Sequence, residues 1–236
     1  MSEPYREQNL LDRVSQADTL QVHYDQEMRR ERELLRRHMP LEGGDVLSVG
    51  CGRHTGRHLF PRPAFRMTGV DLDRGLVDSL VASGELDAGA VGRAGALSFA
   101  DASFDVVLYR LVLHHVAYQG PLQAVFEEAA RLLRSGGALV AVEPGSWHPV
   151  GAGLALANRA GLGPALHGTP DDIPLSPRLL MRGARAAGLD PRLYGLTYGW
   201  RRLPAALQRG LHRLDGLGDR SRAAPFAHTL LLIARA

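Results

Sequence analysis

A glycine-rich turn follows the first strongly apolar segment of the sequence. The residues VLSVGCG, 46–52, lead from an apolar run into Gly50, Cys51 and Gly52 and then into a helical pattern. Glycines let a ligand approach the backbone closely, and free N–H groups at a helix start favour polar or anionic ligand groups. The spacing of Gly50, Gly52 and Gly56 is a weak signal by itself, because glycine pairs also form ordinary turns. The turn indicates a candidate nucleotide site.

An acidic residue ends the next apolar segment. Asp71 follows Gly52 by about 20 residues, the spacing at which an acid can reach the two ribose hydroxyls of a bound nucleoside. The alternative role for Asp71 is to cap a helix, which the following Leu72 and Asp73 would allow. Its place at the end of a strand favours the ligand role.

Two nucleoside cofactors remain in competition at this point, a nicotinamide dinucleotide and S-adenosylmethionine. All 28 basic residues are arginine, so the chain has no lysine. This excludes Schiff-base catalysis, a pyridoxal phosphate aldimine, a standard Walker A loop and the Tyr-x-x-x-Lys pair of short-chain dehydrogenases. Other dehydrogenases stay open.

The elements that must position these residues follow an α/β alternation. Apolar runs suited to buried parallel strands occur at 46–50, 66–71, 104–109 and 138–142, with helical patterns between them. The clearest helix spans 119–134, with Gly136 and Gly137 as its stop. The pattern predicts a doubly wound, open parallel sheet with helices on both faces.

The rest of the chain is less regular. Helix is expected from residue 1 to about 40, a long connection rich in Gly, Pro and His over 144–177, and a helix over 178–187. A strand is expected near 190–197, a second insertion over 200–222 and a last strand at 227–234.

Four blocks in order carry a resemblance to a known family. They are VLSVGCG, GVDLD at 69–73, ALSFADASFDVVLYRLVLHHV at 96–116 and EEAARLLRSGGALVAVEP at 127–144. The sequence resembles class I S-adenosylmethionine-dependent methyltransferases of the ubiquinone/menaquinone-biosynthesis-like (type 11) group. The resemblance implies a mostly parallel, seven-stranded Rossmann-like sheet with a final antiparallel strand. It also implies methyl transfer to a small-molecule acceptor at oxygen, nitrogen or carbon.

The same resemblance implies one domain over 1–236. Residues 1–44 would form a helical cover, 45–143 the cofactor-binding core, and 144–177 and 198–225 substrate-side insertions. Its cofactor residues, carried over by position, are Gly50 and Gly52 under the methionine part with Cys51 between them, Asp71 on the ribose, Leu72 along the adenine, Ala94 at the adenine edge, and Tyr109 and Arg110 beside the sulfonium.

Three positions depart from the family pattern. Ser48 stands where the family usually has an acid near the methionine amino group, and Arg93 where it often has an acid that meets the adenine amino group. Arginine cannot accept that hydrogen bond. Arg53, His54 and Thr55 also move the third glycine to Gly56. A methyltransferase-like binding or partner subunit without catalysis is therefore kept as an alternative, with an NAD-dependent oxidoreductase as a further one.

Histidines supply the candidates for a catalytic base. A base is needed only if the acceptor is a phenol or alcohol. His114 and His115 follow the fourth strand, on the side of the sheet where ligands bind, and one of such a pair is often a structural hydrogen-bonder. His148 and His167 lie in the 144–177 insertion. Among His114, His115, His148 and His167 no pair such as His-x-x-x-His occurs, so no metal site is expected at these histidines and Glu143.

The surface pattern bears on partners and location. Residues 200–222 carry a leucine stripe beside arginines, which suits a lid, a homodimer contact or a cover for an anionic or lipid-like acceptor. Tyr24 could fold over the cofactor or lie in the core.

The net charge of +3 gives no reason to expect nucleic-acid binding, and no segment reaches the roughly 20 apolar residues of a membrane span. We expect a cytoplasmic protein. The single cysteine, Cys51, excludes a disulfide framework.

Overall fold

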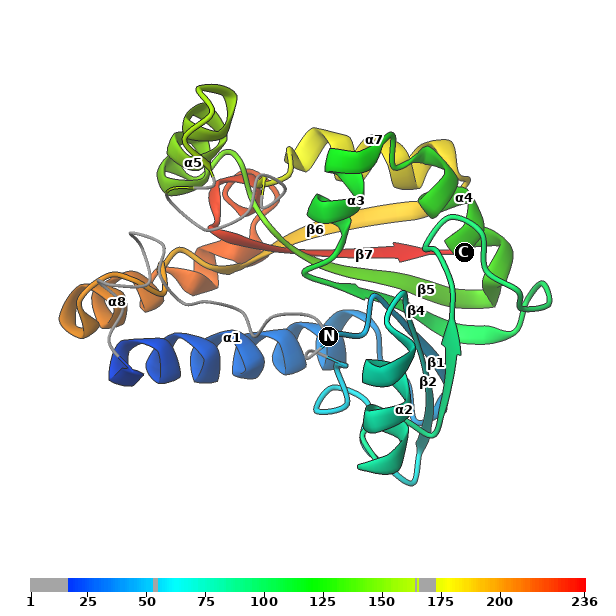
Figure 1. The fold of residues 1–236 in the computed structure, drawn as a ribbon. Helices are drawn as coiled ribbons and strands as arrows, with labels where there is room; N and C mark the ends of the chain where they lie inside the picture. Colours follow the sequence, from blue (N-terminus) through cyan, green and yellow to red (C-terminus); the bar gives the residue numbers. More distant parts are fainter. Residues whose placement is uncertain (1–16, 53–54, 164, 166–172) are drawn as a thin grey trace.

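A seven-stranded sheet forms the centre of the computed structural model, which describes residues 17–52, 55–163, 165 and 173–236 (Figure 1). The strand order is β3-β2-β1-β4-β5-β7-β6. The first five strands in this order are parallel, and β7 runs antiparallel to both of its neighbours. The strands are β1 (Gly44–Val49), β2 (Phe65–Asp71), β3 (Ala88–Val91), β4 (Phe104–Arg110), β5 (Leu133–Pro144), β6 (Asp190–Thr197) and β7 (Thr229–Arg235). This confirms the predicted doubly wound, mostly parallel α/β fold.

Helices cover both faces of the sheet (Figure 1). They are α1 (Ala17–His38), α2 (Arg74–Ala82), α3 (Leu113–Gln119), α4 (Gln123–Leu132), α5 (Pro149–Arg159), α7 (Pro177–Ala186) and α8 (Ala205–His212), with 3-10 helices η2 (Asp215–Asp219) and η3 (Ala224–Phe226). Helices α4 and α7 pack on one face, and α1 and α2 pack on the other. No helix in the described part of the chain is long and apolar enough to cross a membrane.

The core divides into two layers because side chains alternate along each strand. On β4, Val107 and Tyr109 pack toward α4, whereas Val106 and Leu108 pack toward α1 and α2. The central strands are buried on both faces, which is why they read as continuous apolar runs in the sequence.

The helix predicted over 119–134 is present but shorter. Helix α4 spans Gln123–Leu132, and Gln119 is the last residue of α3, which ends before Gly120 and Pro121. Gly136 and Gly137, expected to stop the helix, lie inside β5, which already begins at Leu133. The short strand β3 was not predicted, because its four residues AGAV alternate between half-buried and exposed and lack an apolar run. The last strand begins at Thr229, two residues later than expected.

The contact of α4 with α7 depends on one ring. Phe126 is fully buried, and a Cβ added to Gly183 of α7 would lie 2.5 Å from two of its ring atoms. The helices therefore approach each other across Phe126, with a glycine as the opposing surface.

We expect Phe126→Ala to lower the free energy of unfolding by about 3–5 kcal/mol, because the opposing Gly183 has no side chain that could fill the cavity left by the ring. Denaturant unfolding followed by circular dichroism measures this. The matched control is Phe226→Ala, whose ring is 52% exposed and which should cost about 1 kcal/mol or less. Equal losses for the two variants would contradict this account of the core.

Candidate functional site

A cavity of about 530 Å³ lies at the carboxyl ends of β1, β2 and β4. Its lining includes the glycine turn, the acid at the end of β2 and one histidine of α3. Of the residues proposed from the sequence, the cavity brings together Gly50, Gly52, Asp71, Leu72, Ala94 and His115. In doubly wound folds, ligands bind at this edge of the sheet.

The glycine turn forms one wall because a side chain has no room there. Gly50 has a φ of +63°, and a Cβ at this position would lie 2.3 Å from Cγ2 of Val112. Val112 lines the opposite side of the same cavity. A residue other than glycine at position 50 would therefore both strain the backbone and displace the start of α3.

Asp71 is held in place by backbone N–H groups. Its Oδ2 accepts a hydrogen bond from the N–H of Gly52 at 3.0 Å, and its Oδ1 accepts from the N–H of Leu72 at 2.7 Å. The cap of α2 is Asp73, whose side chain accepts from the N–H of Leu76. The alternative role of Asp71 as the helix cap is therefore wrong, and its carboxylate faces the cavity.

The remaining wall is mostly apolar. Leu72 is 61% exposed although it borders the cavity, so a bound ring would cover it. Arg93 and Ala94 lie beyond it in the loop after β3. This loop is fastened to α4, since the N–H of Leu97 donates to Oε1 of Glu128 at 2.7 Å.

Cys51 lies in the turn, but its side chain points into the core. The thiol is buried next to Gly69, and only the neighbouring glycines line the cavity. Burial, with the nearby charge of Asp71, raises the pKa of Cys51 to about 11. The thiol is therefore protonated at neutral pH and is a packing group.

Tyr109 and Arg110 lie away from the cavity wall. Tyr109 is fully buried, and its hydroxyl donates to the carbonyl of Val125 at 3.4 Å. Burial raises the pKa of this phenol further above its usual value. Leu111 lines the cavity instead, in a left-handed conformation with φ of +58°. Neither this strained residue nor its neighbour Val112 was proposed from the sequence.

Arg110 makes a buried ion pair with helix α1. Its guanidinium donates to both carboxylate oxygens of Glu31, with distances of 2.9–3.3 Å. Burial alone would raise the pKa of Glu31, but the charge of Arg110 and hydrogen bonds bring it below its usual value. Because Val49 pairs with Tyr109 in the sheet, the backbone of Arg110 follows β4 at the level where Gly50 follows β1.

The two adjacent histidines of α3 have different surroundings. His114 is buried, and its Nδ1 lies 2.6 Å from Oε2 of Glu143. Glu143 is itself fully buried and accepts from the N–H groups of Val112 and Leu113 through Oε1. His115 instead faces the cavity, with its ring centre 4.1 Å from that of His114.

His148, the described candidate of the 144–177 insertion, does not line this cavity. His148 caps helix α5 by accepting from the N–H of Val150, and burial lowers the pKa of His148. Its ring contacts His228 at a centroid distance of 5.2 Å. His167, Arg53 and His54 lie outside the described residues. Tyr24 accepts a hydrogen bond from Arg201 at 3.0 Å.

The sequence analysis did not identify a group of three side chains that could bind a metal ion. His23, Glu27 and His228 lie together between α1 and the start of β7. Burial lowers the pKa of His228 to about 3, so its ring is neutral. Burial raises the pKa of Glu27, but hydrogen bonds and charge from His23 outweigh it and bring the value to about 2. The spacing of four between His23 and Glu27 was the signal that could have found two of the three.

A second cavity, of about 810 Å³, lies along α7 and the first half of β6. Trp147, Arg178 and Arg182 are among its lining residues. It shares no residue with the cavity at the glycine turn, so we do not place the cofactor chemistry there.

Comparisons with known proteins agree with the geometry. Residues 47–141 match the family described as "Methyltransferase domain", type 11. No curated protein shows significant sequence similarity to the chain.

Three solved structures illustrate the likeness of the fold. A SAM-dependent methyltransferase from Thermotoga maritima has a TM-score of 0.63 at 15% identity, covering 92% of this chain and 90% of that one. One from Archaeoglobus fulgidus has a TM-score of 0.58 at 16% identity, covering 92% and 99%. Geranyl diphosphate C-methyltransferase from Streptomyces coelicolor A3(2), solved with Mg²⁺, geranyl diphosphate and S-adenosyl-L-homocysteine, has a TM-score of 0.61 at 18% identity, covering 92% and 84%.

These likenesses at low identity concern the fold, and the family match concerns the segment that builds the cavity. With the glycine turn and the acid of β2 in one cavity, residues 47–141 are similar to the type 11 methyltransferase domain family, and the chain has the fold of class I S-adenosylmethionine-dependent methyltransferases.

Proposed function

We propose that the chain transfers a methyl group from S-adenosylmethionine to a small-molecule acceptor, and that the cavity at the glycine turn holds the adenosine. The observation that supports this is the common lining of one cavity by Gly50, Gly52, Asp71 and Leu72. In this arrangement the carboxylate of Asp71 receives the ribose hydroxyls, and the exposed side chain of Leu72 covers one face of the adenine. Ala94 lies at the adenine edge.

The methionine end of the cofactor then points toward the ion pair of Arg110 and Glu31. Ser48 is buried in β1 and supplies no charge where relatives usually have an acid. Glu31, brought in by α1, places a carboxylate next to the same strand end.

The chemistry asked of the protein is mainly alignment. The methyl carbon is already activated by the positive sulfur, so holding donor and acceptor in line supplies much of the rate. The acceptor would lie between α1, α3 and the segments 144–177 and 198–225. His115 borders the cavity and is our candidate base for an acceptor hydroxyl, whereas His114 is a positioning residue held by Glu143.

The first prediction for this site concerns Asp71. We expect Asp71→Asn to weaken S-adenosylhomocysteine binding by about 10- to 150-fold, since a hydrogen bond to a charged group contributes about 1.5–3 kcal/mol. Isothermal titration calorimetry measures the affinity. S-adenosylmethionine and NADH are titrated alongside, and heat with NADH alone would contradict the proposed cofactor site.

Asp73→Asn is the matched control, because it removes the same charge two residues away. Asparagine is as good a helix cap as aspartate, so both the stability and the affinity should stay near those of the unchanged protein. If Asp71→Asn binds as tightly as this control, Asp71 does not contact the ribose.

The second prediction separates the two histidines of α3. A phenol or alcohol acceptor is first identified by measuring the transfer of labelled methyl groups from S-adenosylmethionine. With that acceptor, we expect His115→Gln to lower kcat by about 10²- to 10⁴-fold, the usual contribution of a general base. Unfolding should stay near that of the unchanged protein, because His115 borders the cavity.

His114→Gln should mainly lower the melting temperature, since it removes the partner of the buried carboxylate of Glu143. The value of kcat provides the second readout. It should fall far more in His115→Gln than in His114→Gln. An unchanged kcat in His115→Gln would rule it out as the base.

A further inference from the structure

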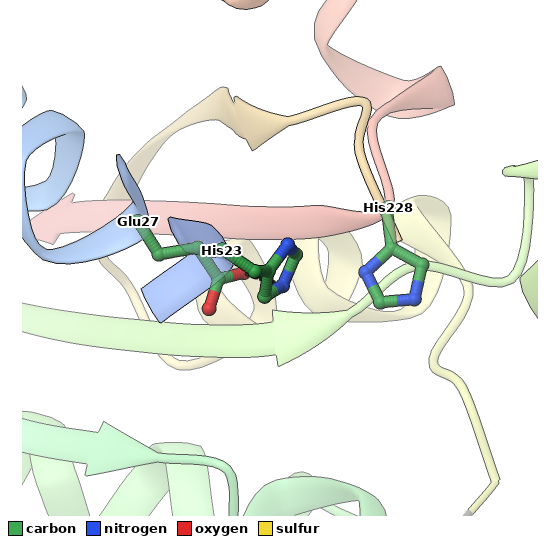
Figure 2. A group of neighbouring side chains, drawn as sticks. All are labelled: His23, Glu27 and His228. Carbon is green, nitrogen blue, oxygen red and sulfur yellow. Dashed lines mark ion pairs between the residues drawn. The ribbon is translucent and has the colours of Figure 1, made fainter. Parts of the chain in front are cut away.

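Three side chains with metal-ligand atoms meet at the junction of α1 and β7. We call His23, Glu27 and His228 the histidine–glutamate cluster. One ligand atom from each lies within 4.8 Å of the other two. Figure 2 shows His23 and Glu27 side by side on the helix, with the ring of His228 facing them from the segment that leads into β7.

The fold holds the three residues in this arrangement. His23 and Glu27 are four residues apart on α1, so they project from the same face of the helix. The backbone of His228 is fixed on both sides, because its N–H donates to Thr197 and its carbonyl accepts from Gly145, each at 2.8 Å. These partners end β6 and follow β5, so the sheet determines where the imidazole lies.

Burial leaves part of the cluster without a hydrogen-bond partner. His23 is 2% exposed and Glu27 is 8% exposed. Nδ1 of His23 is buried with no hydrogen-bond partner among the residues that the structure describes. The same holds for Nε2 of neighbouring His212, whose ring centre lies 6.2 Å from that of His23. Buried ring nitrogens without partners are rare and unfavourable. The nitrogen of His23 that faces Glu27 is Nε2, which is the one available as a ligand of an ion in the cluster.

The distance between the two ligand atoms on α1 matches that around a small cation. His23 Nε2 and Glu27 Oε1 are 3.4 Å apart. Two ligands bound to one tetrahedral ion at about 2.0–2.1 Å are separated by about 3.3 Å. The hydroxyl of Thr229 donates to Glu27 and lies 3.2 Å from Nδ1 of His228. Such outer contacts commonly orient metal ligands.

We propose that the histidine–glutamate cluster binds one divalent transition-metal ion of the zinc class, with two imidazoles and one carboxylate as protein ligands. Imidazole nitrogen selects zinc, iron, cobalt, nickel or copper over magnesium and calcium, which prefer oxygen. Three protein ligands leave a fourth position of a tetrahedral ion for another group.

The ion would join the N-terminal helix to the sheet close to the methyl-transfer site. Glu27 lies one helical turn before Glu31, which pairs with Arg110 beside the glycine turn. An ion here would link α1 to β7 directly. This inference goes beyond the proposed function, and its test does not depend on methyl transfer.

The test begins with the full chain, stripped of metal by a chelator and dialysed. Titration calorimetry with Zn²⁺ should give one ion per chain. At a free Zn²⁺ concentration 100-fold above Kd, the Tm should rise by about 5–10 °C. Absence of both effects would overturn the proposal, leaving the cluster as a buried hydrogen-bonded pair with a neighbouring histidine.

Variants then locate the ion. His23→Gln, Glu27→Gln and His228→Gln should each weaken Zn²⁺ binding by more than about 100-fold, the upper range for loss of an outer partner. The matched control is His38→Gln, at the end of the same helix and about 22 Å along it. Its Nε2 is also buried without a partner among the described residues. Equal binding in all four variants would show adventitious binding by other histidines and would overturn the proposal.

A variant that gains a spectroscopic signal distinguishes loss of the metal site from failure to fold. Co²⁺ bound to the unchanged protein should show visible bands of nitrogen and oxygen ligation without a thiolate charge-transfer band. His228→Cys should keep the ion and add that band, because sulfur then replaces one imidazole. Cys51 is present in both proteins, so a band that appears only in His228→Cys places the ion at residue 228. A folded His228→Cys that binds Co²⁺ without the band would contradict the assignment.

Discussion

The carboxylate of Glu143 determines where the cavity forms. It lies fully buried near the end of β5 and accepts hydrogen bonds from the first N–H groups of α3, while its second oxygen contacts the ring of His114. A buried carboxylate must be compensated by such contacts, so the start of α3 cannot move without exposing a charge to an apolar interior. The position of α3 in turn places Val112 and His115 opposite the glycine turn.

A second set of charges attaches helix α1 to the rest of the molecule. Glu31 pairs with Arg110 at the end of β4, and Arg30 pairs with Asp219 in the segment before β7. Both arginines are largely buried. Loss of Glu31 would leave the charge of Arg110 without this partner, whereas Arg30 would keep its second pair with Glu33. The helix that carries the histidine–glutamate cluster is thereby fixed against both the cofactor side and the 198–225 segment.

The central strands could be predicted from the sequence because they are buried on both faces, which requires continuous apolar runs. The glycine turn and Asp71 could be predicted as neighbours at one edge of the sheet for a similar reason, since their residue types and spacing are typical of a local strand–turn–helix geometry. The positions of Tyr109 and Arg110 could not be found this way. A strand end is visible in the sequence, but successive residues point to opposite faces, so Tyr109 enters the core under α4 while Arg110 turns toward α1.

Contacts between residues far apart in the sequence are the second kind of feature that could not be predicted. His23 and His228 are separated by most of the chain, and no local pattern shows that the antiparallel β7 brings them together. The same applies to Glu31, which lies in an arginine- and glutamate-rich helix that reads as a solvated surface. Its full burial follows from the end of β4 lying beneath it.

The contact between Gly50 and Val112 also bears on engineering of the cofactor specificity. Position 50 has no space for an added methyl group, so the cavity cannot be reshaped at this residue. Val112 contributes its side chain from the facing wall, and its backbone hydrogen bond to Glu143 does not depend on that side chain. Shortening Val112 to alanine would remove the atoms that lie closest to Gly50 and would widen the cavity there, while the turn keeps its shape.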